Sequence, residues 1–188
     1  MGESFGLYKI GNDEEMMKQV TSINVACGFH AGDPHVMRRT VNLAKKYGVA
    51  VGAHPGYPDP IGFGRRRFEV TPEEAGDYIL YQVGALKAFC EAAGLELQHV
   101  KPHGQLYNMA WKDESLARGI LEAIRQIKPE PIFFALYNTI PYEMAQSMGV
   151  RVVGELYADL DYAPDGTTFI KKVHGEIDVA ATVKKVLK

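Results

Sequence analysis

The sequence predicts one α/β domain over residues 1–188, in which parallel strands alternate with helices. Short apolar runs rich in valine and isoleucine, bounded by glycine or proline, are typical of buried strands. These runs alternate with segments that carry helix start and stop signals. The chain is long enough for a sizeable core, and its 46% hydrophobic and 23% charged residues are ordinary for a globular protein. This βαβα order implies a parallel sheet with right-handed crossovers.

The predicted helices begin and end at recognisable residues. Asp33-Pro34 supplies an N-cap and a first-turn proline for a helix that Gly48 ends. Thr71-Pro72-Glu73-Glu74 is a capping box, and the long helix that it opens ends at Gly94. Three further helices are predicted from Asp113 to about Lys128, from about Pro141 to Met148, and from Asp178 to Leu187.

The predicted strands lie between these helices. They span Ile23–His30, Val49–His54, Leu97–His103, Ile132–Leu136 and Val150–Gly154, with a weaker copy at Phe169–His174. Five or six strands fit both an open doubly wound sheet and an incomplete barrel. No Gly-x-Gly-x-x-Gly pattern follows the first strand, which argues against a dinucleotide or P-loop site.

Three predicted strands end in a histidine: His30, His54 and His103. The carboxyl ends of parallel strands share one edge of the sheet, where α/β folds place their chemistry. Lys101 lies two residues before His103, so both share a face if the strand continues through Pro102. We therefore take these three histidines and the lysine as the candidate catalytic residues.

Carboxylates are expected at the same edge. Glu155 ends the Val150 strand, Asp159 follows in its loop, and Glu3 is a further candidate. A histidine and a carboxylate with a lysine nearby suit general acid–base hydrolysis. Two histidines and a carboxylate would instead suit zinc with an open position for water, so both chemistries stay open. Tyr107 is a candidate hydrogen-bond donor into the site, with core packing as the equal alternative.

A long loop rich in glycine and proline runs from His54 to Arg67. Long loops in compact domains are usually functional or disordered, and three prolines stiffen this one, so we interpret it as an ordered active-site loop. Arg65 and Arg66 suit bidentate recognition of a carboxylate or phosphate, with a solvated loop as the alternative.

The remaining composition excludes several classes of protein. A net charge of −2 with interspersed signs does not indicate a nucleic-acid partner. No apolar stretch approaches the roughly 20 residues of a membrane span, and no signal-peptide pattern opens the chain. The two cysteines, Cys27 and Cys90, are expected to be buried thiols, which fits a cytoplasmic protein.

Five segments, in order, resemble the LamB/YcsF family. They are Gly2–Gly6, Asn24–Pro34, Gly52–Pro58, Gly62–Arg66 and Val100–Gly104, and the match runs from Gly2 to about Gly166. The resemblance implies a (β/α) barrel of the seven-stranded type found in glycoside hydrolases and sugar deacetylases. It also implies ATP-dependent opening of 5-oxo-L-proline to L-glutamate, in complex with separate B and C subunits. ATP would be a co-substrate, and a divalent metal is an open possibility.

The resemblance gives the candidate residues expected roles. His30, His54, Lys101 and His103 would bind the phosphorylated lactam and relay protons. The expected substrate-binding residues are Glu3, Asn24, Arg65, Arg66, Tyr107, Glu155 and Asp159. The alternatives are a metal-dependent deacetylase of a sugar amide and a truncated, non-catalytic binding subunit.

The chain departs from the family pattern at both ends. Family members carry a strand of the type Asp-Leu-Asn-x-Asp before Gly-Glu-Ser, whereas only Met1 precedes Gly2 here. The segment Val173-His174-Gly175-Glu176 also follows Gly166 much earlier than in the family, and it has Glu in place of Asp. We therefore expect a barrel that is incomplete at its first strand and near its C-terminus.

Overall fold

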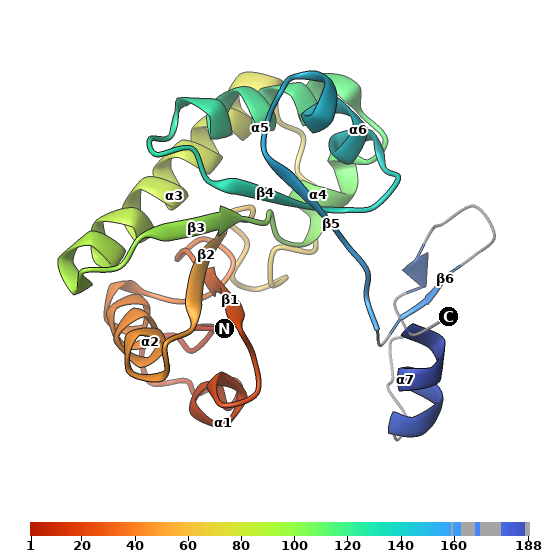
Figure 1. Ribbon diagram of the computed structural model, residues 1–188. Coiled ribbons are helices and arrows are strands. Elements are labelled where there is room, and N and C mark those ends of the chain that lie inside the picture. Colours follow the sequence, from red (N-terminus) through yellow and green to blue (C-terminus); the bar gives the residue numbers. More distant parts are fainter. Residues whose placement is uncertain (159, 163–167, 170–177, 187–188) are drawn as a thin grey trace.

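The computed structural model of this chain describes residues 1–158, 160–162, 168–169 and 178–186. Its centre is a parallel sheet whose strands follow one another in chain order (Figure 1): β1 (Ser22–Ala26), β2 (Ala50–His54), β3 (Leu97–Val100), β4 (Ile132–Leu136) and β5 (Val152–Glu155). A doubly wound sheet would reverse its strand order, and this one does not. The order is that of a barrel wall, and β1 and β5 are the edges of the described arc.

The connecting helices form where the capping signals predict them. They are α2 (Pro34–Tyr47), α3 (Pro72–Ala93), α5 (Glu114–Gln126) and α6 (Ile140–Ser147), and they lie outside the curved sheet (Figure 1). Asp33 caps α2 by accepting a hydrogen bond from the Val36 amide, and Thr71 caps α3 in a complete capping box. Gly48 and Gly94 end these helices at φ of 66° and 73°, where a side chain would be strained.

The two faces of the sheet differ in polarity. Val25, Val51, Val100 and Phe133 belong to the main core, which lies between the sheet and the helices. Side chains alternate between faces along each strand, so Asn24 and Gly52 lie on the inner face. The register shifts between Val51 and Gly52, which pair with Leu97 and His99. This irregularity places His99 beside Gly52, and the inner face is therefore partly polar.

Two predicted strands are shorter than expected. β1 ends at Ala26, so His30 lies in the following loop rather than at the strand end. β3 ends at Val100, and His103 is the N-cap of α4 (Gly104–Ala110); neither this helix nor α1 (Asp13–Met17) was predicted. The Lys101 and His103 amides nevertheless donate to the carbonyls of Ala53 and Pro55, at 2.9 and 2.8 Å. Strand-like pairing thus extends beyond the strand and keeps Lys101 and His103 on one face.

The described part of the C-terminal segment contains two short strands outside the main sheet. β6 (Asp161–Tyr162) and β7 (Thr168–Phe169) pair antiparallel in a separate sheet. Of the weaker strand predicted at Phe169–His174, only Phe169 lies among the described residues, so the sixth strand stays a prediction. His174, which was to end the sixth strand, lies outside the described residues. Asp178 precedes α7 (Val179–Val186), as predicted. In the described part of the chain, no helix has the length and apolar character needed to cross a membrane.

Candidate active site

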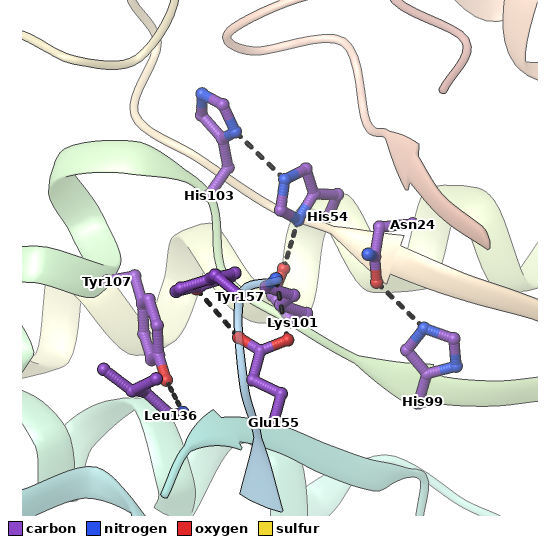
Figure 2. A network of polar contacts seen from close by, with 9 residues as sticks. All are labelled: Asn24, His54, His99, Lys101, His103, Tyr107, Leu136, Glu155 and Tyr157. Atoms are coloured by element: carbon purple, nitrogen blue, oxygen red, sulfur yellow. Dashed lines mark hydrogen bonds and ion pairs between the residues drawn. The ribbon is translucent and has the colours of Figure 1, made fainter. Parts of the chain in front are cut away.

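His54 and His103 form a hydrogen-bonded pair at the carboxyl edge of the sheet (Figure 2). His54 ends β2, and its Nε2 lies 3.0 Å from Nδ1 of His103. The outer nitrogens of the pair meet main-chain carbonyls: His54 Nδ1 lies 2.6 Å from the Lys101 oxygen, and His103 Nε2 lies 2.7 Å from the Phe63 oxygen. The sequence predicted a common edge, and the structure brings these two rings into direct contact.

His30 completes a cluster of three imidazoles. Its ring is stacked on that of His103, with centroids 3.8 Å apart and planes 6° apart, and it meets His54 edge-on at 5.6 Å. His30 is 1% exposed, and neither of its ring nitrogens has a hydrogen-bond partner among the described residues. Burial lowers its pKa to about 2, with His103 adding to the effect, so this ring is neutral.

Burial also controls the charge of the hydrogen-bonded pair. It lowers the pKa of His103 to about 4, and it lowers that of His54 well below 6.5. Nearby positive charge acts in the same direction, from Arg65 on His103 and from Lys101 on both rings. Burial and neighbouring positive charge therefore both oppose protonation of these imidazoles.

Lys101 and Glu155 form an ion pair next to the histidines (Figure 2). The Lys101 ammonium lies 2.8 Å from Glu155 Oε2 and 4.7 Å from the centre of the Tyr157 ring. Tyr157 donates its phenol to Glu155 Oε1 at 2.9 Å. Lys101 reaches the site from the end of β3 and Glu155 from the end of β5, so the sheet places both predicted residues at one edge.

The loop after β2 covers the histidines. Gly64 lies so close to them that a Cβ there would meet His30 and His103 at 2.8 Å, and its φ of +67° also favours glycine. The two arginines of this loop have different positions. Arg66 pairs with the fully buried Asp59, whose pKa it lowers, so its guanidinium holds the loop together. Arg65 lies over the Phe63 ring, near enough to His103 to lower the pKa of that imidazole.

A pocket of about 300 Å³ opens beside the cluster. It is lined by Met1, Glu3, Ser22, Ile23, Asn24 and His54, and it thus joins three predicted site residues. Asn24 is held by a residue that sequence reasoning left out, because its Oδ1 lies 2.9 Å from Nε2 of the buried His99 (Figure 2). The sequence carried a signal for His99, because the alternating spacing of His99, Lys101 and His103 puts all three on one face of an extended segment.

The other two predicted substrate contacts have different outcomes. Tyr107 is buried, and its phenol oxygen accepts a hydrogen bond from the Leu136 amide, away from the histidine pair (Figure 2). The structure therefore gives the Tyr107 phenol a main-chain hydrogen-bond partner, and Tyr107 does not line the pocket. Asp159 lies outside the described residues.

The donor geometry of the three described histidines does not fit a metal ion. His54 and His103 direct their nitrogens at each other and at carbonyls, and the stacked rings of His30 and His103 cannot aim in-plane lone pairs at one centre. Among the described residues, no group of three or more His, Cys, Asp or Glu side chains is arranged to hold an ion.

Comparison with known proteins supports a common origin over nearly the whole chain. A protein of Thermococcus onnurineus, named as the A subunit of 5-oxoprolinase, is 59% identical over 94% of this chain and 69% of its own length. A protein of Campylobacter jejuni with the same name is 50% identical over 100% of this chain and 74% of its own length. The chain thus spans about two thirds to three quarters of such relatives.

A solved structure agrees with these sequences. The lactam utilization protein of Thermus thermophilus superposes with a TM-score of 0.86 and 47% identity, covering 88% of this chain and 67% of that one. The family model described as LamB/YcsF family matches residues 1–188. Five motifs in order, a site at the carboxyl edge of a barrel-like sheet, and these matches together show that the chain belongs to the LamB/YcsF family.

Proposed function

We propose that this chain is the A-type subunit of an ATP-dependent 5-oxoprolinase, which opens 5-oxo-L-proline to L-glutamate. The observation that carries the proposal is the identity of 50–60% to relatives named as the A subunit of 5-oxoprolinase. The proposal includes B and C subunits as partners, ATP as co-substrate and a location in the cytoplasm. Cys27 and Cys90 fit that location, since both are buried free thiols.

The chemistry of the site supports this assignment. A lactam is an unreactive amide, and ATP would supply activation by phosphorylating its carbonyl oxygen. Water then adds to the ring carbon. If phosphate leaves at this point, the lactam is re-formed; if the ring nitrogen leaves, the ring opens to an acyl phosphate, which water converts to glutamate and phosphate.

The productive route therefore needs a proton for the departing nitrogen. Lys101 is an ammonium donor next to the histidine pair, and Glu155 and Tyr157 fix its position. Glu3 and Asn24 line the adjacent pocket, where a carboxylate and an amide suit the N–H and C=O of a lactam. We assign proton delivery to Lys101 and lactam positioning to Glu3 and Asn24.

The test is glutamate release from 5-oxo-L-proline and ATP, with and without the B and C subunits. We expect release with both partners present, and a loss of roughly 100-fold or more in His54→Ala and His103→Ala. His35→Ala is the matched control, because His35 is exposed on α2, and it should keep wild-type activity. Full activity of His54→Ala or His103→Ala would contradict the assignment of this site.

Two other results would replace the proposal. Release that needs stoichiometric zinc and no partner would indicate the metal-dependent deacetylase class. Binding of 5-oxo-L-proline without turnover, even with both partners, would indicate a non-catalytic binding subunit.

A further inference from the structure

The hydrogen bonds of the His54–His103 pair require an unusual number of protons. The pair has four ring nitrogens in a chain of three contacts, and both ends of that chain are main-chain carbonyls. A carbonyl only accepts, so His54 Nδ1 and His103 Nε2 must both carry protons. Two neutral rings would then face each other with bare lone pairs at 3.0 Å. All three hydrogen bonds form only when a third proton lies between the rings, and the pair then carries one positive charge.

The surroundings oppose that charge while the site is unliganded. Burial disfavours it, and three cations lower the pKa of one or both rings: Lys101, which follows β3, Arg65 from the covering loop, and the amino group of Met1. His30, whose ring is stacked on His103, is neutral, and so is the buried Cys27 thiol, which interacts with the main chain of His54. Glu155 is already paired with Lys101. The hydrogen bonds and the environment thus favour opposite states of the same pair.

We propose that the His54–His103 pair takes up its third proton when an anionic group enters the pocket beside it, so that anion binding and protonation are coupled. An anion offsets the repulsion from the three cations, and the hydrogen-bond chain is already arranged for the charged state. His54 lines the pocket and is hydrogen-bonded to His103, so a group in the pocket lies directly beside the pair. The neutral His30 ring, which is stacked on His103, further stabilises a positive charge on the His103 imidazole.

The carboxylate of 5-oxo-L-proline is the anion that we assign to this pocket, and only that identity rests on the proposed function. Glu3 is the one acidic side chain among the lining residues, and it would accept the lactam N–H instead of facing the carboxylate. The neutral lactam 2-pyrrolidinone lacks the carboxylate and should bind without proton uptake.

The experiment is titration calorimetry of the full chain at neutral pH in buffers of different ionisation enthalpy, which counts protons taken up on binding. The probes are 5-oxo-L-proline, inorganic phosphate and 2-pyrrolidinone. We expect uptake approaching about one proton per bound anion and none for 2-pyrrolidinone. His54→Gln and His103→Gln each break the chain of three contacts, and each should abolish the uptake. His35→Gln, on the surface of α2, should leave it unchanged.

Each outcome of these titrations either supports or overturns the coupling of anion binding to protonation. Anion binding without proton uptake, or uptake that persists in a folded His54→Gln or His103→Gln variant, would overturn the coupling. Failure of both anions to bind at millimolar concentrations would overturn it too. Phosphate binding with proton uptake, but no binding of 5-oxo-L-proline, would support the coupling and contradict the proposed function. Melting temperature identifies the folded variants, and either variant alone suffices.

Discussion

Gly52 leaves the space that the His99 ring occupies on the inner face of the sheet. It lies in β2, in register with Asn24 on β1 and His99 on β3. A Cβ at this position would lie 2.0 Å from His99 Nε2 and 2.2 Å from Cδ2. His99 is fully buried and stacked on Phe134 with centroids 4.1 Å apart, so its ring has no room to withdraw. We predict that Gly52→Ala displaces His99 and releases Asn24.

The expected loss of stability has two parts. Overpacking of a well-packed site costs about 1–3 kcal/mol. Loss of the hydrogen bond between His99 and Asn24 adds about 1 kcal/mol. The free energy of unfolding should therefore fall by about 2–4 kcal/mol, and the melting temperature should fall by roughly 5–15 °C for a domain of this size.

Urea denaturation measures the change, and two further variants test its cause. Gly84→Ala is the control, because a Cβ there meets nothing within 4 Å and helix α3 favours alanine. Gly52→Ala combined with His99→Ala should cost less than the sum of the single changes, since the new methyl enters the vacated space. A Gly52→Ala protein within about 0.5 kcal/mol of wild type, or strict additivity in the double variant, would refute the steric argument.

Three further variants test other parts of the structure. Tyr107→Phe removes the hydrogen-bond acceptor of the buried Leu136 amide, so the free energy of unfolding should fall by about 1–3 kcal/mol. The KM for 5-oxo-L-proline in the proposed reaction should stay unchanged, and a raised KM would indicate that Tyr107 binds the substrate. Burial lowers the pKa of His99 to about 4, so the unfolded chain binds the extra proton between about pH 6.5 and 4. The contribution of His99 to the free energy of unfolding is fully present above that window, and it should fall by up to about 1.4 kcal/mol per pH unit as the pH is lowered through it. Urea denaturation at several pH values measures this slope, which should be smaller in His99→Gln. Thr71→Ala removes the side chain that caps α3, so the free energy of unfolding should fall by about 0.5–2 kcal/mol and the urea midpoint should fall with it. An unchanged midpoint would mean that Glu74 alone is enough to cap the helix.

The sequence was most informative about local structure. Helix starts at Asp33, Thr71 and Asp113 are confirmed, because a capping side chain bonds amides only two or three residues away. Parallel strands and a common edge for Lys101 and Glu155 followed from the order of elements. The predicted boundary of β3 was wrong because His103 ends a strand-like segment and also occupies the N-cap position of α4, and no separate sequence signal marks these two positions.

Residues alone therefore determined the family motifs, the α/β order and the edge of the sheet that carries the candidate site. Only the tertiary structure decided which side chains meet there. The contact of His54 with His103, the support of Asn24 by His99 and the pairing of Arg66 with the buried Asp59 depend on register, on one irregular strand pairing and on the path of the covering loop. Such contacts join side chains through tertiary packing, and no local pattern encodes the distance between them.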